Sequence, residues 1–225
     1  MNRAKLLKTA KPLGFKEEMY RAFVELRKRQ TRRIESINDH PICIDKDTWG
    51  NSTSVVWYGD YGVNGSAVKP RYQVGDIVYL TEPVQIETFS YDAHGGMADV
   101  QYLWERYDRP NVERNIDLLV EDVKKLLARK GEGAPYAPTT ARFMRKVFAR
   151  EFARVTDVRI ERLQDISPND CRAEGIPSEN TDVGVRYCFG QLWDSINANR
   201  EKGKYAWEAN PYVWAYSLER LEVSS

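Results

Sequence analysis

Histidine, cysteine and one-sided charge are all scarce in this 225-residue chain, and each scarcity excludes a class of protein. With two histidines, a two-histidine ribonuclease mechanism requires both to meet in space, and no HExxH, GxGxxG or GxxxxGK[ST] motif occurs. Three cysteines without a C-x-x-C pair argue against a disulfide scaffold and fit a reducing cytosol. Because 34 basic and 33 acidic residues nearly cancel, the bulk charge predicts no partner.

A long apolar run is also missing. No stretch of 18 apolar residues occurs and no apolar segment follows the basic beginning, so we expect a soluble, unexported, cytoplasmic protein that contacts no membrane. The hydrophobic content of 42% and the aromatic content of 12% are typical of a globular fold. The length suits one large domain, with or without insertions.

Apolar spacing predicts a chain in which strands outnumber long helices. Residues 1–14 suggest a loose arm, and residues 15–29 have the spacing of a helix with one apolar face. Further helices are expected over 112–126, 168–174 and 189–196, and strands over 55–58, 77–80, 152–163 and 212–223. Because helices and strands do not alternate regularly, the pattern favours an α+β fold over a Rossmann-type sheet.

The most informative local feature is a cationic run, Arg27-Lys28-Arg29-Gln30-Thr31-Arg32-Arg33. Mutual repulsion among five cations in a folded site costs free energy unless an anion or a buried carboxylate offsets it. We therefore expect this run to line a polar cleft that receives an anionic or polar ligand. The plainer alternative is that these side chains only complement a helix dipole and face solvent.

A set of motifs in chain order resembles the ASCH domain, whose β-barrel is similar to the PUA domain of RNA-modifying enzymes. The motifs are Lys28-x-x-Thr31-x-Arg33, Val74-Gly75-Asp76, Thr156-Asp157-Val158, Leu163-Gln164-Asp165-Ile166-Ser167, Ala173-Glu174-Gly175, Phe189-x-x-Leu192-Trp193 and a last strand with Trp214. The likeness is greatest to the larger ASCH proteins of bacteriophages and prophages. It covers the core segments 15–36, 70–86 and 150–223 of a single domain, 1–225, with insertions at 38–68 and 88–147.

The resemblance implies a PUA-like barrel with flanking helices, and it implies a function. Family members include an amidohydrolase that removes the acetyl group from N4-acetylcytidine, and a ribonuclease. Lys28, Thr31 and Glu174 match the catalytic lysine, threonine and glutamate of that amidohydrolase by motif. We therefore expect RNA or a modified pyrimidine nucleoside as the partner, with no metal or other cofactor. The residues expected to bind the substrate are Arg29, Gln30, Arg32 and Arg33.

Elementary chemistry describes how such a site would work. Lys28 and Thr31 are three positions apart, so they share a face if the first helix continues through them. A threonine hydroxyl needs a base to accept its proton, and lysine serves as one only when its pKa falls. Glu174 could orient the lysine, and Arg33 could neutralise a developing oxyanion. The alternative for Glu174, which precedes Gly175, is an ordinary exposed position at a helix end.

Other functions stay open at the level of sequence: a non-catalytic RNA-binding module, a ribonuclease, or a phage assembly or host-interaction protein. Cations and phenylalanines interleave between Arg142 and Arg162 and could follow a nucleic-acid backbone, although core anchors are the simpler interpretation of the phenylalanines. The spacings of His40-Pro-Ile-Cys43 and Asp92-Ala-His94 suit a metal, but a structural or solvated loop is the simpler interpretation.

Overall fold

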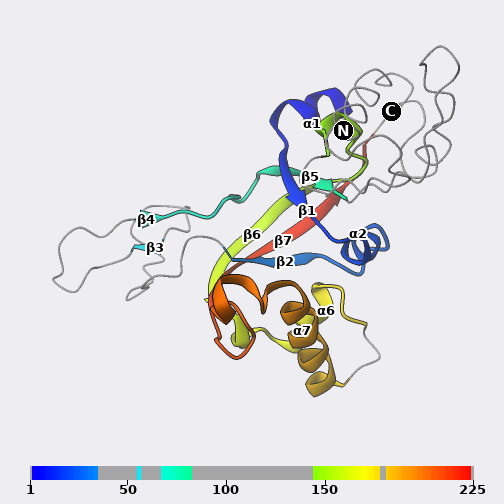
Figure 1. Cartoon of the computed structure of the whole chain (residues 1–225). Helices are drawn as coiled ribbons and strands as arrows, with labels where there is room; N and C mark the ends of the chain where they lie inside the picture. Colours follow the sequence, from blue (N-terminus) through cyan, green and yellow to red (C-terminus); the bar gives the residue numbers. More distant parts are fainter. Residues whose placement is uncertain (1, 35–54, 57–66, 83–143, 178–180, 224–225) are drawn as a thin grey trace, which may run out of the picture. The chain divides into compact units, whose positions relative to one another are not determined.

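A computed structural model describes residues 2–34, 55–56, 67–82, 144–177 and 181–223 (Figure 1). The chain forms two compact units. The first unit comprises Met1–Tyr20, Val78–Phe152 and Leu221–Ser225, and the second comprises Arg21–Ile77 and Ala153–Arg220. Among the described residues, no helix has the length and apolarity needed to cross a membrane.

The described part of the chain is a mixed α+β fold, as the sequence predicts. Its strands are β1 (Lys11–Gly14), β2 (Gln30–Arg33), β3 (Val55–Val56), β4 (Ala67–Val68), β5 (Ile77–Thr81), β6 (Phe152–Arg162) and β7 (Tyr212–Leu221). Its helices are α1 (Arg3–Thr9), α2 (Glu17–Val24), α6 (Pro168–Ala173) and α7 (Asp182–Asn197), with short 3-10 turns η2 (Lys146–Phe148), η3 (Leu163–Asp165) and η4 (Arg200–Gly203). Five strands form one mixed sheet in the order β1-β5-β6-β7-β2, and β3 pairs with β4.

In the first unit, the expected loose arm is instead α1 followed by β1, so that prediction is wrong. The lysines at 5, 8 and 11 that suggested an arm are exposed, whereas Leu6 and Leu13 are buried. The Asn2 side chain caps α1 by accepting a hydrogen bond from the Ala4 N–H at 2.9 Å. β1 runs parallel to β5 with Leu13 opposite Leu80, so apolar burial orders the segment despite its basic surface.

The helix expected over 15–29 is right only in its first part. α2 ends at Val24, and Leu26 has a φ of 63°, a left-handed conformation that a continuing helix does not contain. Lys28 then forms an antiparallel bridge with Glu174, and β2 begins at Gln30. Because the helix does not continue through residue 31, Lys28 and Thr31 do not share one side of a helix.

The elements around α6 follow their local signals. The Ser167 Oγ accepts a hydrogen bond from the Asp170 N–H at 3.1 Å, and Pro168 begins the helix. Glu174 is the C-cap, and Gly175 follows it with a φ of 101°. The strands predicted over 77–80, 152–163 and 212–223 and the helix around 189–196 are also confirmed.

The sheet formed by β2 and β7 has two chemically different faces. Paired residues share a face and chain neighbours lie on opposite faces, and the register pairs Thr31 with Tyr216 and Arg32 with Ala215. Val213 belongs to the apolar core formed with α6 and α7, so the odd-numbered residues of β7 lie on the side of the sheet toward these helices. We call this side the helical face. The helical face carries Gln30, Arg32, Val213, Ala215 and Ser217. The opposite side, the aromatic face, carries Thr31, Arg33, Trp214 and Tyr216.

Trp193 and Trp214 lie in the core, at 5% and 0% exposure. The predicted insertions 38–68 and 88–147 and the helix over 112–126 lie mostly or wholly outside the described residues. The single-domain organisation with two insertions therefore stays a prediction.

Candidate functional site

Lys28 and Glu174 form a buried ion pair in the second unit. The Lys28 Nζ lies 2.5 Å from Glu174 Oε2, and it also donates to the Glu174 backbone carbonyl at 2.9 Å. The two residues are only 3% and 4% exposed. The structure thus brings together two of the three residues that the motif comparison selected, although 146 positions separate them.

The backbone at the end of α6 makes this approach possible. The Arg29 N–H donates to the Ala173 carbonyl at 2.6 Å, next to the bridge between Lys28 and Glu174. A Cβ at Gly175 would lie 3.2 Å from the Ala22 Cβ and 3.4 Å from the Lys28 Cβ. Glycine at 175 therefore satisfies both a left-handed φ and a close contact.

Arg32 extends the pair into a larger set of charges. Its Nη1 donates to Glu174 Oε1 at 3.1 Å and its Nε to Glu161 Oε1 at 2.6 Å, while its Nη2 lies 3.4 Å from Asp170 Oδ2. The Arg32 side chain has no exposed surface, and its guanidinium lies 5.9 Å from the centre of the Phe189 ring. Arg32 is therefore held between three carboxylates and α7.

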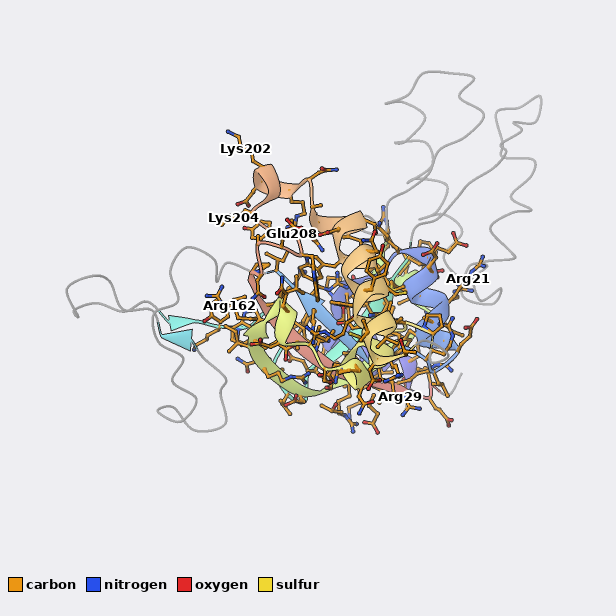
Figure 2. The ribbon with its side chains drawn as sticks, turned by 90° about the horizontal axis from the view of Figure 1, so that it is seen from below. Arg21, Arg29, Arg162, Lys202, Lys204 and Glu208 are labelled. Atoms are coloured by element: carbon orange, nitrogen blue, oxygen red, sulfur yellow. The ribbon has the colours of Figure 1, made fainter. Side chains whose placement is uncertain are left out.

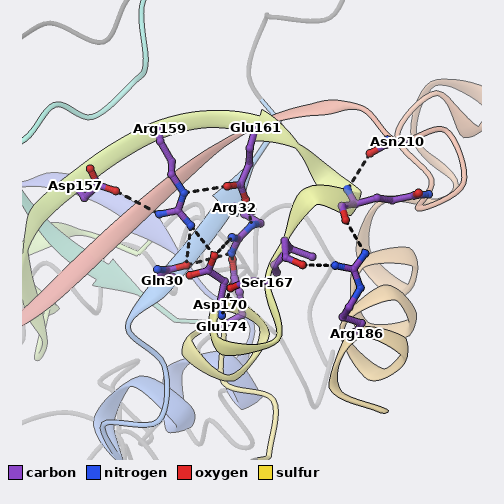
Figure 3. Close-up of polar contacts among 12 residues, drawn as sticks. Gln30, Arg32, Asp157, Arg159, Glu161, Ser167, Asp170, Glu174, Arg186 and Asn210 are labelled. Atoms are coloured by element: carbon purple, nitrogen blue, oxygen red, sulfur yellow. Dashed lines mark hydrogen bonds and ion pairs between the residues drawn. The ribbon is translucent and has the colours of Figure 1, made fainter. Parts of the chain in front are cut away.

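Arg159 continues the same pattern toward solvent (Figure 3). Its Nε lies 2.9 Å from Glu161 Oε2, its Nη2 lies 2.9 Å from Asp170 Oδ2, and its Nη1 lies 3.2 Å from Asp157 Oδ2. Side-chain exposure rises along the set, from 6% at Glu174 through 23% at Asp170 and 30% at Arg159 to 53% at Asp157. We call this set the charged network; it consists of Lys28, Arg32, Asp157, Arg159, Glu161, Asp170 and Glu174.

The charged network offsets part of the positive charge of the cationic run. Three cations meet four carboxylates of the same chain, so the protein itself supplies the offsetting negative charge. Arg27 is paired as well, since its Nη2 lies 2.5 Å from Glu25 Oε2. The charge of the cationic run therefore does not require an external anionic ligand.

Two groups of the network have displaced pKa values. Burial lowers the pKa of Lys28; Glu174 acts in the opposite direction, and Arg33 and Arg32 add to the lowering. Burial acts to raise the pKa of Asp170, but Arg159 and Arg32 outweigh it, so the pKa of Asp170 is lowered. Lys28 thus releases its proton more readily than an exposed lysine does.

Thr31 does not face this pair. Arg32, its neighbour in β2, projects toward Glu174, so Thr31 projects to the aromatic face together with Arg33. The predicted triad is thereby divided, with Lys28 and Glu174 on the side of β2 that carries Arg32 and Thr31 on the opposite side. The reason is the change from helix to strand, because a spacing of three aligns side chains only in a helix.

The residues predicted to bind substrate occupy different environments. Arg32 is buried in the network, and Gln30 is half-buried beside it, accepting from Arg32 Nη1 at 3.3 Å. Arg33 is half-buried on the aromatic face, and Arg29 is exposed at the periphery (Figure 2), with its Nε donating to the Leu26 carbonyl at 3.3 Å. Their binding roles stay predictions.

The site prediction did not include Arg159, Glu161 and Asp170, although they complete the network. Asp157, Arg159 and Glu161 alternate in charge at every second position of β6, a pattern typical of one strand face. That signal was available in the sequence. The contact of Asp170 with Arg32 depends on the fold, and no local pattern of residues predicts it.

Among the residues that the structure describes, no group of three or more His, Cys, Asp or Glu side chains could hold a metal ion. The metal-like spacings at 40–43 and 92–94 lie outside that part of the chain.

Comparison with known proteins gives no match: no family model, no curated protein and no solved structure matches this chain. The ASCH resemblance therefore rests on the motifs alone.

Proposed function

We propose that this chain is a PUA-like protein of the ASCH type that binds RNA or a modified pyrimidine nucleoside at the charged network. The observation that carries the proposal is the buried approach of Lys28 and Glu174, 2.5 Å apart. Both belong to motifs that carry the family resemblance. Replacing a buried ion pair by well-packed apolar residues of similar volume is often neutral or stabilising, so stability alone does not account for Lys28 and Glu174.

Hydrolysis of an N4-acyl amide, as in N4-acetylcytidine, is the reaction that we assign to this site. Lys28, whose pKa is lowered, would first pass its proton to Glu174; the neutral amine would then accept a proton from water as the water attacks the acyl carbon, and would return it to the exocyclic amine as the C–N bond breaks. Glu174 would hold the lysine in place through its carboxylate. We assign the nucleophile to water because Thr31 projects from the opposite face.

Access to the pair would lie along the partly exposed end of the network. A base that approaches from Asp157 and Arg159 would meet Asp170 and Gln30 before it reaches Lys28. The Gln30 carbonyl oxygen accepts from Arg32 Nη1 at 3.3 Å and the Asp170 carboxylate accepts from Arg159 Nη2 at 2.9 Å, and the edge of a pyrimidine would exchange these bonds for its own.

Acetyl release from N4-acetylcytidine tests the reaction in four proteins: the wild type, Lys28→Met, Glu174→Gln and Thr31→Val. Removal of a general base lowers turnover by roughly 10²–10⁴-fold, so we expect that loss in Lys28→Met and a comparable loss in Glu174→Gln. Thr31→Val keeps the side-chain shape and is expected to retain activity. No turnover by the wild type, or equal turnover by Lys28→Met, would remove the enzymatic proposal.

A non-catalytic RNA-binding module is the second candidate, and exposed cations with an aromatic neighbour favour it. The exposed Arg162 stacks on Tyr212 with its Cζ 3.8 Å from the ring centre. Phe148 and Phe152 do not contribute, because they are buried at 3% and 0% exposure. This candidate predicts that RNA binds without chemical change and that its affinity falls steeply as the salt concentration rises. The absence of binding in low salt would exclude it.

A further inference from the structure

Arg32 carries a buried hydrogen-bond donor for which the charged network supplies no acceptor. The Arg32 side chain has no exposed surface, and its Nη2 makes no hydrogen bond within the part of the chain that the structure describes. Asp170 Oδ2 lies 3.4 Å from Nη2, which is an ion-pair contact without the alignment of a hydrogen bond. Buried side-chain donors are almost always paired, because an unpaired one loses its bonds to water and gains none in return. The Nη2 group therefore points to a missing acceptor.

The other two nitrogens of the same guanidinium are engaged (Figure 3). Nε donates to Glu161 Oε1 at 2.6 Å, and Nη1 donates to Glu174 Oε1 at 3.1 Å and to Gln30 Oε1 at 3.3 Å. A guanidinium is planar, so bonds at two of its nitrogens also fix the direction in which the third donates. Nη2 is thus a donor that is held in place before any ligand arrives.

The position of this donor relates it to the Lys28–Glu174 pair. Lys28 Nζ lies 2.5 Å from one oxygen of the Glu174 carboxylate, and Arg32 Nη1 donates to the other oxygen at 3.1 Å. Nη2 instead contacts Asp170, whose side chain is 23% exposed and belongs to the end of the network that approaches solvent. Arg32 therefore connects the buried pair with the partly exposed end, and Nη2 is the nitrogen on the side of Asp170.

The surrounding charges indicate what kind of acceptor fits. The charged network contains four carboxylates and three cations, and two of the carboxylates, those of Asp170 and Glu174, contact the Arg32 guanidinium on either side of Nη2 and Nη1. A phosphate or carboxylate group would be repelled by them. A carbonyl oxygen accepts a hydrogen bond without adding a charge. The acceptor that suits Nη2 is therefore an uncharged carbonyl.

We propose that Arg32 binds the acyl carbonyl oxygen of the substrate through Nη2 and stabilises the oxyanion that forms there. This inference rests on the proposed amide hydrolysis. As the oxygen of water bonds to the acyl carbon, the electron pair of the C=O bond moves onto the acyl oxygen, to which Nη2 donates. The pair returns when the C–N bond breaks, and Arg32 neither gains nor loses a proton. The role that the sequence suggested for Arg33 then belongs to Arg32, because Arg33 projects to the aromatic face.

The Nη2 protons are the reporter for a test by NMR on the wild type. The full-length protein is labelled with ¹⁵N at arginine, and the Arg32 resonances are assigned from their contacts with the Phe189 ring, whose centre lies 5.9 Å from Arg32 Cζ. N4-acetylcytidine is added in excess and renewed during the measurement, and cytidine is the matched ligand without the acyl group. We expect a downfield shift and slower exchange of the Nη2 protons with N4-acetylcytidine, and a clearly smaller response to cytidine.

Kinetics on a variant test the role in the reaction. Arg32→Lys keeps the positive charge but loses the fork that reaches several acceptors at once. Loss of one oxyanion donor lowers kcat by roughly 10²–10³-fold, so we expect that loss in Arg32→Lys, with a smaller change in KM. Arg154→Lys is the matched control, because its arginine is 44% exposed and pairs with Glu219 outside the network, and it is expected to keep the wild-type kcat. Circular dichroism checks that both variants fold, and the NMR test does not depend on either.

The outcomes separate this inference from the proposed function. Turnover by the wild type without a response at Nη2, or with equal kcat in the wild type and Arg32→Lys, overturns the role of Arg32 and leaves the hydrolysis standing. A response at Nη2 without turnover removes the hydrolysis and supports Arg32 as a carbonyl-binding residue. An equal response to cytidine or to sodium phosphate overturns the assignment to the acyl oxygen. Nη2 protons that already exchange slowly without ligand overturn it too, because the acceptor would then be present in the free protein.

Discussion

Removal of one member of the Lys28–Glu174 pair is expected to destabilise the fold strongly, and removal of both much less than the sum. Each single substitution leaves a buried charge without its main partner, whereas the double substitution leaves neither. Breaking a buried pair at one end costs about 3–5 kcal/mol of unfolding free energy.

The contacts of each residue predict which single variant loses more unfolding free energy. In Lys28→Met, the Glu174 carboxylate keeps the Arg32 bond at 3.1 Å, so we expect a loss near the lower limit, about 3 kcal/mol. In Glu174→Gln, two buried cations, Lys28 and Arg32, lose their shared carboxylate, so we expect about 5 kcal/mol. The double variant is expected to fall short of the sum by at least about 2 kcal/mol.

Urea unfolding monitored by circular dichroism measures all three variants against the wild type. Arg27→Met is the control, because its partner Glu25 lies at the same 2.5 Å but the two side chains are 48% and 56% exposed. We expect the control to lose at most about 1 kcal/mol. If Glu174→Gln loses no more than the control, or if the two single losses simply add, the reasoning from burial is refuted.

Three other perturbations have expected outcomes. Because the pKa of Asp170 is lowered in the fold, its stabilising contribution is present above the ordinary aspartate pKa of 3.8 and is lost as pH falls through the folded pKa. Asp170→Asn should flatten that acid dependence in urea melts, and an unchanged profile contradicts this expectation. Gly175→Ala should lower the melting temperature more than Gly75→Ala, since both have positive φ but only at 175 does the added Cβ meet neighbours; equal losses contradict this. Ser167→Ala should lose about 1 kcal/mol through its cap on α6, and no loss in urea unfolding would mean that the cap is inert.

The local elements show what can be predicted without the fold. Ser167, Pro168 and Gly175 mark the limits of α6 through caps that depend on adjacent residues only. The same holds for the turn at Gly75 before β5, where φ is 91°. The prediction of a loose arm over 1–14 is wrong for the complementary reason. Few of its residues are apolar, and the segment is ordered by contacts that are distant in sequence, such as the pairing of β1 with β5.

Within the site, the sequence determined which residue types are available, and the motif resemblance selected Lys28 and Glu174. Only the tertiary structure decided that Arg32 lies between Glu161, Asp170 and Glu174 and that Thr31 lies on the other face. The physical reason is the period of the backbone. A helix continuing through residue 31 would have placed Lys28 and Thr31 together, whereas a strand places neighbours on opposite sides, and the end of α2 at Val24 together with pairing to β7 selects the strand.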